Sequence, residues 1–119
     1  MSHPVYQLKA QFFKTLGHPA RIRILEVLRE GDHTVGELTP KVGIEPSHLS
    51  HQLAVLRRAH VVQGRKVGNS VIYSVADPRI FQLLEVARQI LSSSLLATRE
   101  LLADLDALSF EAAPPQGRP

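Results

Sequence analysis

Apolar residues recur at every third or fourth position through residues 5–16 and again through residues 19–28. This spacing puts them on one side of a helix, so it predicts two amphipathic helices. Gly17 is expected to end the first helix, Pro19 fits the first turn of the second, and Gly31 is expected to stop it. The recurring apolar positions are Val5, Leu8, Phe12 and Leu16 in the first helix, and Ile22, Leu25, Val27 and Leu28 in the second.

Two further helices follow, separated by a short turn at residues 43–45. Thr34 and Glu37 have the three-residue spacing of a capping box and predict a short helix that Gly43 ends. Pro46 then opens a helix that is apolar on one side and polar on the other. Two helices joined by a turn of three or four residues containing Gly indicate a helix-turn-helix. The apolar positions are Val35, Leu38 and Val42 in the third helix, and Leu49, Leu53 and Leu56 in the fourth.

The pattern changes to extended runs after Ala59. Residues 61–63 and 71–75 are mostly β-branched or aromatic, which is typical of strands. Gly68-Asn69 between them is a turn signal, and Arg65 and Lys66 place two cations near the tip. The sequence therefore predicts a β-hairpin with a basic end.

A last helix is expected to begin near Asp77-Pro78, and Ser92–Ser94 is a candidate kink in it. Its apolar surface is too broad for a small domain to cover, as is that of the first helix. We therefore expect both helices to pack against a second copy of the chain. The residues expected in this dimer interface are Val5, Leu8, Phe12, Leu83, Leu84, Ala87, Ile90, Leu91 and Leu95.

The length of 119 residues predicts a single domain, with residues 1–108 folded and residues 109–119 a disordered, Pro-rich tail. A composition of 44% apolar but 5% aromatic residues favours a Leu, Val, Ile and Ala core. Together with the pattern, it predicts a mainly α fold with a small β-hairpin (α+β).

Charge and cysteine content narrow the function. Residues 1–76 carry a net charge of +5 and residues 77–119 a net charge of −2, so the positive field belongs to the helix-turn-helix and the hairpin. The chain has no Cys, which excludes disulfides, thiolate metal sites and thiol redox sensing. Neither a signal peptide nor a membrane-spanning run is seen, so a soluble, cytoplasmic protein without membrane partners is expected.

Four motifs in order resemble the ArsR/SmtB family of bacterial transcriptional repressors. They are FKTLGHPARIRIL at residues 13–25, TVGEL at 34–38, SHLSHQLAVLR at 47–57 and GNSVIYS at 68–74. The resemblance runs from about Val5 to Leu105. It implies a winged helix-turn-helix fold that dimerises through its first and last helices. It also implies a homodimer that binds an inverted-repeat operator in double-stranded DNA and leaves it when an inducer binds.

The family's usual metal-sensing residues are missing from this chain. Many members bind metals through Cys in the stretch matching residues 34–38, or through Asp, His and Glu on the last helix. Here there is no Cys, and the His residues are all at position 60 or before. Four carboxylates on the last helix would form an oxygen-only site unlike that for zinc. We expect no metal site and no cofactor.

The polar side of the fourth helix holds side chains that can read base edges, and the basic hairpin can contact phosphates or enter the minor groove. Arg57 and Arg58 could equally cover their own helix, and Asn69 and Ser70 could serve the turn. A metal shared by His48 and His51 lacks a third ligand. Ser50 and His51 are sequence neighbours that do not face each other on a helix, so no enzyme is expected. The expected DNA-binding residues are Ser47, His48, Ser50, His51, Gln52, Arg57, Arg58, Arg65, Lys66, Asn69 and Ser70.

The alternative is a dimeric protein-interaction module that binds DNA only incidentally, and the basic hairpin argues against it. The sequence does not name the inducer: a small organic molecule or anion, a partner protein and no ligand at all stay open. The operator and the regulated genes are equally open.

Overall fold

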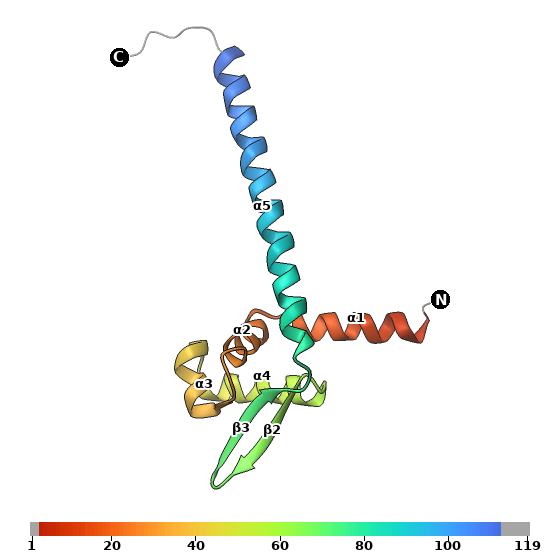
Figure 1. The fold of residues 1–119 in the computed structure, drawn as a ribbon, viewed down its shortest axis with the longest axis vertical. Coiled ribbons are helices and arrows are strands. Elements are labelled where there is room, and N and C mark those ends of the chain that lie inside the picture. The colour runs from red at the N-terminus through yellow and green to blue at the C-terminus, as the bar shows by residue number, and fades with distance from the viewer. Residues whose placement is uncertain (1–2, 113–119) are drawn as a thin grey trace. The chain divides into compact units, whose positions relative to one another are not determined.

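The computed structural model describes residues 3–112, which form five helices and three strands (Figure 1). The chain divides after Phe81 into two compact units. The first unit holds every element up to the start of the last helix, and the second holds the rest of that helix. In chain order the elements are α1 (Pro4–Leu16), α2 (Pro19–Leu28), β1 (His33–Thr34), α3 (Val35–Val42), α4 (Pro46–Arg58), β2 (Val62–Val67), β3 (Ser70–Val75) and α5 (Arg79–Ala112).

Short polar side chains and glycine set the helix ends, largely where the sequence predicts them. The capping box at α3 is confirmed: Thr34 Oγ1 accepts from the Glu37 backbone N–H at 3.2 Å, and Glu37 Oε1 accepts from the Thr34 N–H at 2.8 Å. Gly43 ends α3 with a φ of 79°, a left-handed conformation that favours glycine. His18 caps α2, its Nδ1 accepting from the Ala20 N–H at 3.1 Å.

The core of the first unit lies between α2, α3 and α4. Leu49, Leu53 and Leu56 of α4 are fully buried, as the spacing predicts. Ile24 and Leu25 of α2 are fully buried as well. Because one side of α4 is taken up by this core, its other side is left to solvent.

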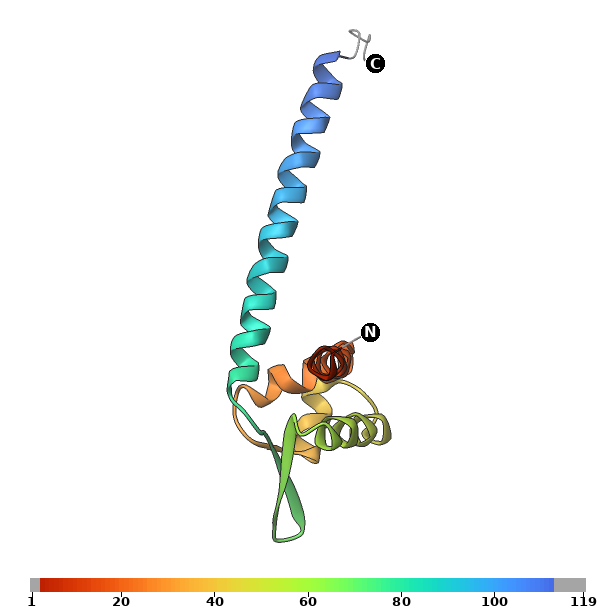
Figure 2. The ribbon, with the colours of Figure 1, turned by 90° about the vertical axis from the view of Figure 1, so that its right-hand side faces the viewer.

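A three-stranded antiparallel sheet in the order β1-β3-β2 completes the unit, and its β2–β3 hairpin projects from the helices as a wing (Figures 1 and 2). The strands are longer than expected: Val67 pairs with Ser70, which leaves Gly68 and Asn69 as the two-residue turn. Gly68 has a φ of 61°, as the first position of a type II′ turn requires. Strand β1 was not predicted, and it ties His33 to Tyr73 of β3.

Helix α5 runs without interruption for 34 residues, or about 50 Å. The helical backbone continues through Ser92–Ser94, the candidate kink. Residues 109–112, which we expected in the tail, are also helical. The rest of the expected tail, residues 113–119, lies outside the described residues.

Candidate nucleic-acid interface

The N-terminal half of α4 presents polar side chains to solvent. Ser47, His48, Ser50 and His51 are exposed, while Leu49 between them is fully buried. Pro46 at the first helical position fixes where this face begins. The helix-turn-helix therefore displays hydroxyl and imidazole groups that can both donate and accept hydrogen bonds.

Gln52 does not lie on that exposed face, and its expected place there is wrong. Its side chain is only 4% exposed, and both of its polar atoms have partners. Oε1 accepts from Arg21 Nε at 2.8 Å, and Nε2 lies 3.1 Å from His48 Nε2. Arg21 also donates from a terminal nitrogen to the Thr15 carbonyl at 3.1 Å. A polar chain thus links the end of α1 and the start of α2 to α4.

The C-terminal end of α4 carries Arg57 and Arg58, whose exposed side chains form no hydrogen bond or ion pair with the described residues. They line a hollow of about 360 Å³ together with Ser50, Ala54 and Tyr73. Two unpaired guanidinium groups beside a hydroxyl-bearing residue suit an anion such as a phosphate. The hollow lies between α4 and the wing, because Tyr73 belongs to β3.

Arg65 and Lys66 are exposed on β2, three and two residues before the turn rather than at the tip itself. Neighbouring residues of a strand point to opposite faces of the sheet, so these two cations present themselves on opposite sides of the wing. Asn69 is one of the two turn residues, and Ser70 begins β3. Both are exposed near the two cations.

His33 anchors the base of the sheet, a role that the sequence gave no sign of. Its buried ring donates from Nδ1 to the Gly31 carbonyl at 2.6 Å, because a carbonyl can only accept. Nε2 then accepts from Lys41 Nζ at 3.0 Å, and Lys41 also pairs with Glu30 at 3.3 Å. These contacts hold the β1 edge against α3. Sequence pattern misses them because they join residues two to eleven positions apart with no periodicity.

Two carboxylates titrate below their usual range. The hydrogen bond from the Thr34 backbone lowers the pKa of Glu37. Hydrogen bonds from Arg79 lower the pKa of Asp77 to about 2, through its guanidinium at 2.6 Å and its backbone N–H at 2.9 Å. Both groups stay charged at neutral pH, and both stabilise a helix start rather than a reactive site.

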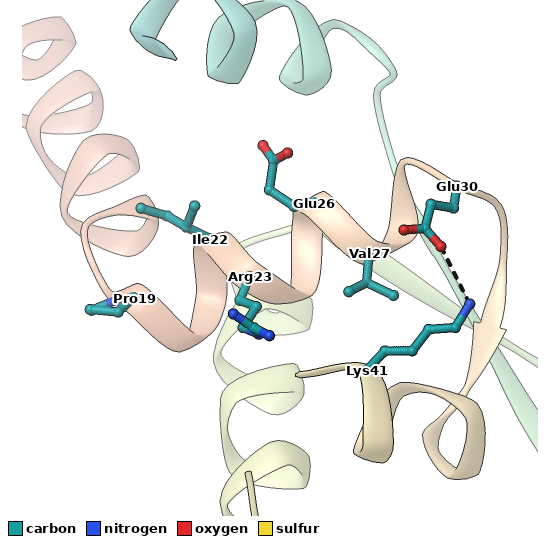
Figure 3. Close-up of a pocket in the computed structure, with 7 residues that line it drawn as sticks. All are labelled: Pro19, Ile22, Arg23, Glu26, Val27, Glu30 and Lys41. Carbon is teal, nitrogen blue, oxygen red and sulfur yellow. Dashed lines mark hydrogen bonds and ion pairs between the residues drawn. The ribbon is translucent and has the colours of Figure 1, made fainter. Parts of the chain in front are cut away.

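A second, open hollow of about 910 Å³ lies over α2 and α3 (Figure 3). Arg23 and Val27 point toward α3 in this view, while Glu26 points away from it, and Lys41 reaches Glu30 across the hollow. Its charges are of both signs, so it has no clear preference for an anion or a cation. Within residues 3–112, no group of three His, Asp or Glu side chains could hold a metal ion. None of the described helices is long and apolar enough to cross a membrane.

Large apolar side chains remain exposed on two helices. On α1 these include Val5, Leu8 and Phe12, and α5 carries a stripe along much of its length. Apolar residues three or four positions apart share one side of α5. Leu83 and Leu84 at the start of this stripe are half-buried, and the apolar residues further along it are exposed. The stripe continues past the predicted interface residues. Its members are Leu83, Leu84, Ala87, Ile90, Leu91, Leu95, Leu101, Leu102 and Leu105.

The sequence profile described as "Bacterial regulatory protein, arsR family" matches residues 18–63, which span α2 to the start of β2. Over 107 residues the chain is 58% identical to the uncharacterized HTH-type transcriptional regulator Rv0081 of Mycobacterium tuberculosis, covering 89% of this chain and 94% of that protein. The chain belongs to the ArsR family. The resemblance drawn from the four motifs is thereby confirmed.

Solved structures of similar proteins have the same fold. The crystal structure of Rv0081 matches with a TM-score of 0.76 at 59% identity, covering 82% of this chain and 98% of that one. The transcriptional repressor BigR of Xylella fastidiosa matches with a TM-score of 0.64 at 32% identity, covering 76% and 96%. A homodimeric winged helix-turn-helix DNA-binding domain of Mycobacterium bovis shares the fold, with a TM-score of 0.69 at 22% identity over 76% and 84%. The predicted winged helix-turn-helix is confirmed, and this ArsR-family chain is a transcriptional regulator; its relatives carry the names of regulators, not enzymes.

Proposed function

We propose that this ArsR-family protein is a homodimeric repressor that binds an inverted-repeat operator. The observation that carries the proposal is the exposed row of Ser47, His48, Ser50 and His51 on α4, opposite a fully buried leucine side. A helix with such a face fits the major groove, and residues near its N-terminus reach base edges in helix-turn-helix proteins. BigR, a relative at 32% identity, bears the name of a transcriptional repressor.

The dimer is supported by the apolar surfaces of α1 and α5. Soluble monomers rarely expose contiguous apolar patches of this extent, and a second copy would cover them. Two recognition helices would then enter successive major grooves about 34 Å apart. The wings would contact the flanking backbone or the minor groove through Arg65 and Lys66.

We propose that the inducer is not a metal ion bound at the family's usual sites, which are the stretch matching residues 34–38 and the last helix. Thiolate ligation is impossible without Cys, and α5 contains no His. A small organic molecule, an anion or a partner protein fits the residues present better. Such a ligand would have to bind the free and DNA-bound dimers with different affinities.

The test is a fluorescence-anisotropy titration of the full chain against DNA from upstream of its own gene, with scrambled DNA of the same length as control. We expect selective binding. The logarithm of the association constant should fall linearly with the logarithm of the salt concentration, with a slope of roughly −0.9 per phosphate contacted. Addition of zinc or a chelator should change nothing. A flat salt response would overturn the DNA proposal, and release by zinc would overturn the argument on ligands.

A pair of charge-removing variants tests the role of the wing. Arg65→Ala should weaken binding to specific and scrambled DNA alike and reduce the salt slope by roughly 0.9, because one phosphate contact is lost. Lys14→Ala removes the same charge from the side of α1 opposite Val5, Leu8 and Phe12, and should leave the slope unchanged. Equal effects of the two variants would mean that the wing acts only through net charge. Failure of the chain to bind heparin at low salt would instead favour the protein-interaction module.

A further inference from the structure

The side-chain amide of Gln52 has its orientation fixed by Arg21. A guanidinium carries five N–H donors and no acceptor, so the Gln52 atom that faces Arg21 Nε at 2.8 Å is the carbonyl oxygen Oε1. The amide NH₂ must then face the other way, toward His48. Burial keeps water from competing for either atom, since the side chain is 4% exposed. Arg21 is itself held by the Thr15 carbonyl at 3.1 Å.

This orientation dictates where His48 carries its proton. Gln52 Nε2 can only donate, so His48 Nε2, 3.1 Å away, accepts and bears no hydrogen. The neutral imidazole therefore carries its proton on Nδ1. No partner for His48 Nδ1 occurs within the described residues, and the side chain is exposed at the third position of α4. The ring of His18 lies edge-on to it, with 6.3 Å between centroids, and makes no hydrogen bond with it.

We propose that Arg21 and Gln52 are positioning residues that make His48 a hydrogen-bond donor toward the DNA. This inference rests on the proposed function, in which α4 enters the major groove. A donor at this place selects base edges that present an acceptor: N7 or O6 of guanine, N7 of adenine, or O4 of thymine. Cytosine presents its N4 amino donor there and is disfavoured. Neither positioning residue touches a base, yet both set which bases are accepted.

The first test needs no DNA. Nitrogen-15 NMR of the histidine rings in the full chain should show His48 protonated on Nδ1. Gln52→Glu replaces the donor by a carboxylate that only accepts, so the proton should move to Nε2. Gln52→Ala should remove the preference for Nδ1, while the exposed His51 serves as an internal control that neither variant changes. A proton on Nε2 of His48 in the unsubstituted protein overturns the proposal.

The second test uses selection from a library of randomised operators. His48→Ala should lower discrimination at one base position per half-site by roughly 2- to 10-fold, the range for one hydrogen bond. Arg21→Ala and Gln52→Ala should broaden the same position without changing the salt slope. Arg23→Ala, also on α2, is the matched control and should leave every position unchanged.

The outcomes separate the two proposals. If the unsubstituted protein selects a sequence but His48→Ala alters no position, the assignment of His48 fails and the repressor stands. If Arg23→Ala also broadens the base preference at that position, the loss of a positive charge explains the broadening and the positioning role fails. If the unsubstituted protein selects no sequence at all, both proposals fail.

Discussion

Gly64 of β2 lies directly opposite Tyr73 of β3, and the tyrosine ring occupies the space that a side chain at position 64 would need. A Cβ atom at Gly64 would lie 3.3 Å from Tyr73 Cε1 and 2.9 Å from Val71 Cγ1. The second distance is shorter than real Cβ contacts allow, and a β-branched valine has little freedom to turn away. The absence of a side chain at Gly64 therefore lets the ring of Tyr73 pack against β2, and Tyr73 is buried.

Gly64→Ala should destabilise the protein by about 1–3 kcal/mol, the usual cost of inserting a methyl group into a packed site. Urea unfolding at a fixed protomer concentration measures it. Gly36→Ala is the matched control, because its Cβ would meet only Thr34 Oγ1 at 3.8 Å, an ordinary contact. That change should be neutral or stabilising by up to about 1 kcal/mol. Equal stabilities of the two variants would contradict the packing of Tyr73 over Gly64.

His60→Gly should stabilise the protein by about 1 kcal/mol. His60 follows α4 with a φ of 60°, where a side chain is strained and glycine is not. The helix ends in a Schellman motif: the Val61 N–H bonds to the Leu56 carbonyl at 2.9 Å, and the His60 N–H to the Arg57 carbonyl at 3.0 Å. Thermal unfolding at one protomer concentration measures the gain. His60→Ala keeps the strain and should show no gain; a destabilised His60→Gly would mean that the imidazole itself holds the joint.

The loss of folding stability at low pH should depend on Asp77 and Arg79. The folded pKa of Asp77, about 2, lies below the ordinary value of 3.8, so this carboxylate stabilises the protein fully above about pH 4. The contribution is lost as the pH falls through about 2. Asp77→Asn should therefore be less stable than the unsubstituted protein at neutral pH, with the difference vanishing in strong acid.

Carbon-13 NMR of the Asp77 carboxyl group gives a direct measure of the same interaction. Arg79→Ala should raise the pKa of Asp77 toward 3.8, because the guanidinium hydrogen bonds are the largest cause of the shift. Arg99→Ala, far along α5, should leave the titration unchanged. An unshifted Asp77 in Arg79→Ala would show that another group holds the carboxylate charged.

Leu91→Glu should break the proposed dimer, whereas Leu96→Glu should not. Both leucines are exposed on α5, at 62% and 56%, but five residues place them about 140° apart around the helix. Only Leu91 belongs to the apolar stripe. Sedimentation equilibrium should give the monomer mass for Leu91→Glu and the dimer mass for Leu96→Glu. Dissociation of both variants, or of neither, would place the interface elsewhere.

Local signals in the sequence were enough for the helix-turn-helix and its ends. The capping box at Thr34 and Glu37, the stop at Gly43 and the start at Pro46 each depend on residues within one turn. The fully buried side of α4 follows from spacing alone. These features could be predicted because chain neighbours determine them.

Contacts between distant residues could not be read in this way. Gln52 is buried because Arg21, 31 residues earlier, satisfies its amide oxygen, and a polar residue on a polar face gives no hint of that. Strand β1 is two residues long and has no period to detect. The partners of Arg21 are an amide oxygen and a backbone carbonyl, which no charge pattern in the sequence indicates.

Thr34 ends strand β1 and at the same time caps α3, with no residue between the two elements. The sheet that carries the wing and the first helix of the helix-turn-helix are thus joined at a single residue, with no hinge to absorb rotation. We therefore expect the wing and α4 to keep their relative orientation when the proposed dimer binds DNA. Adaptation to operators whose half-sites differ in separation would then come from how the proposed dimer holds its two copies apart, and not from movement within either copy.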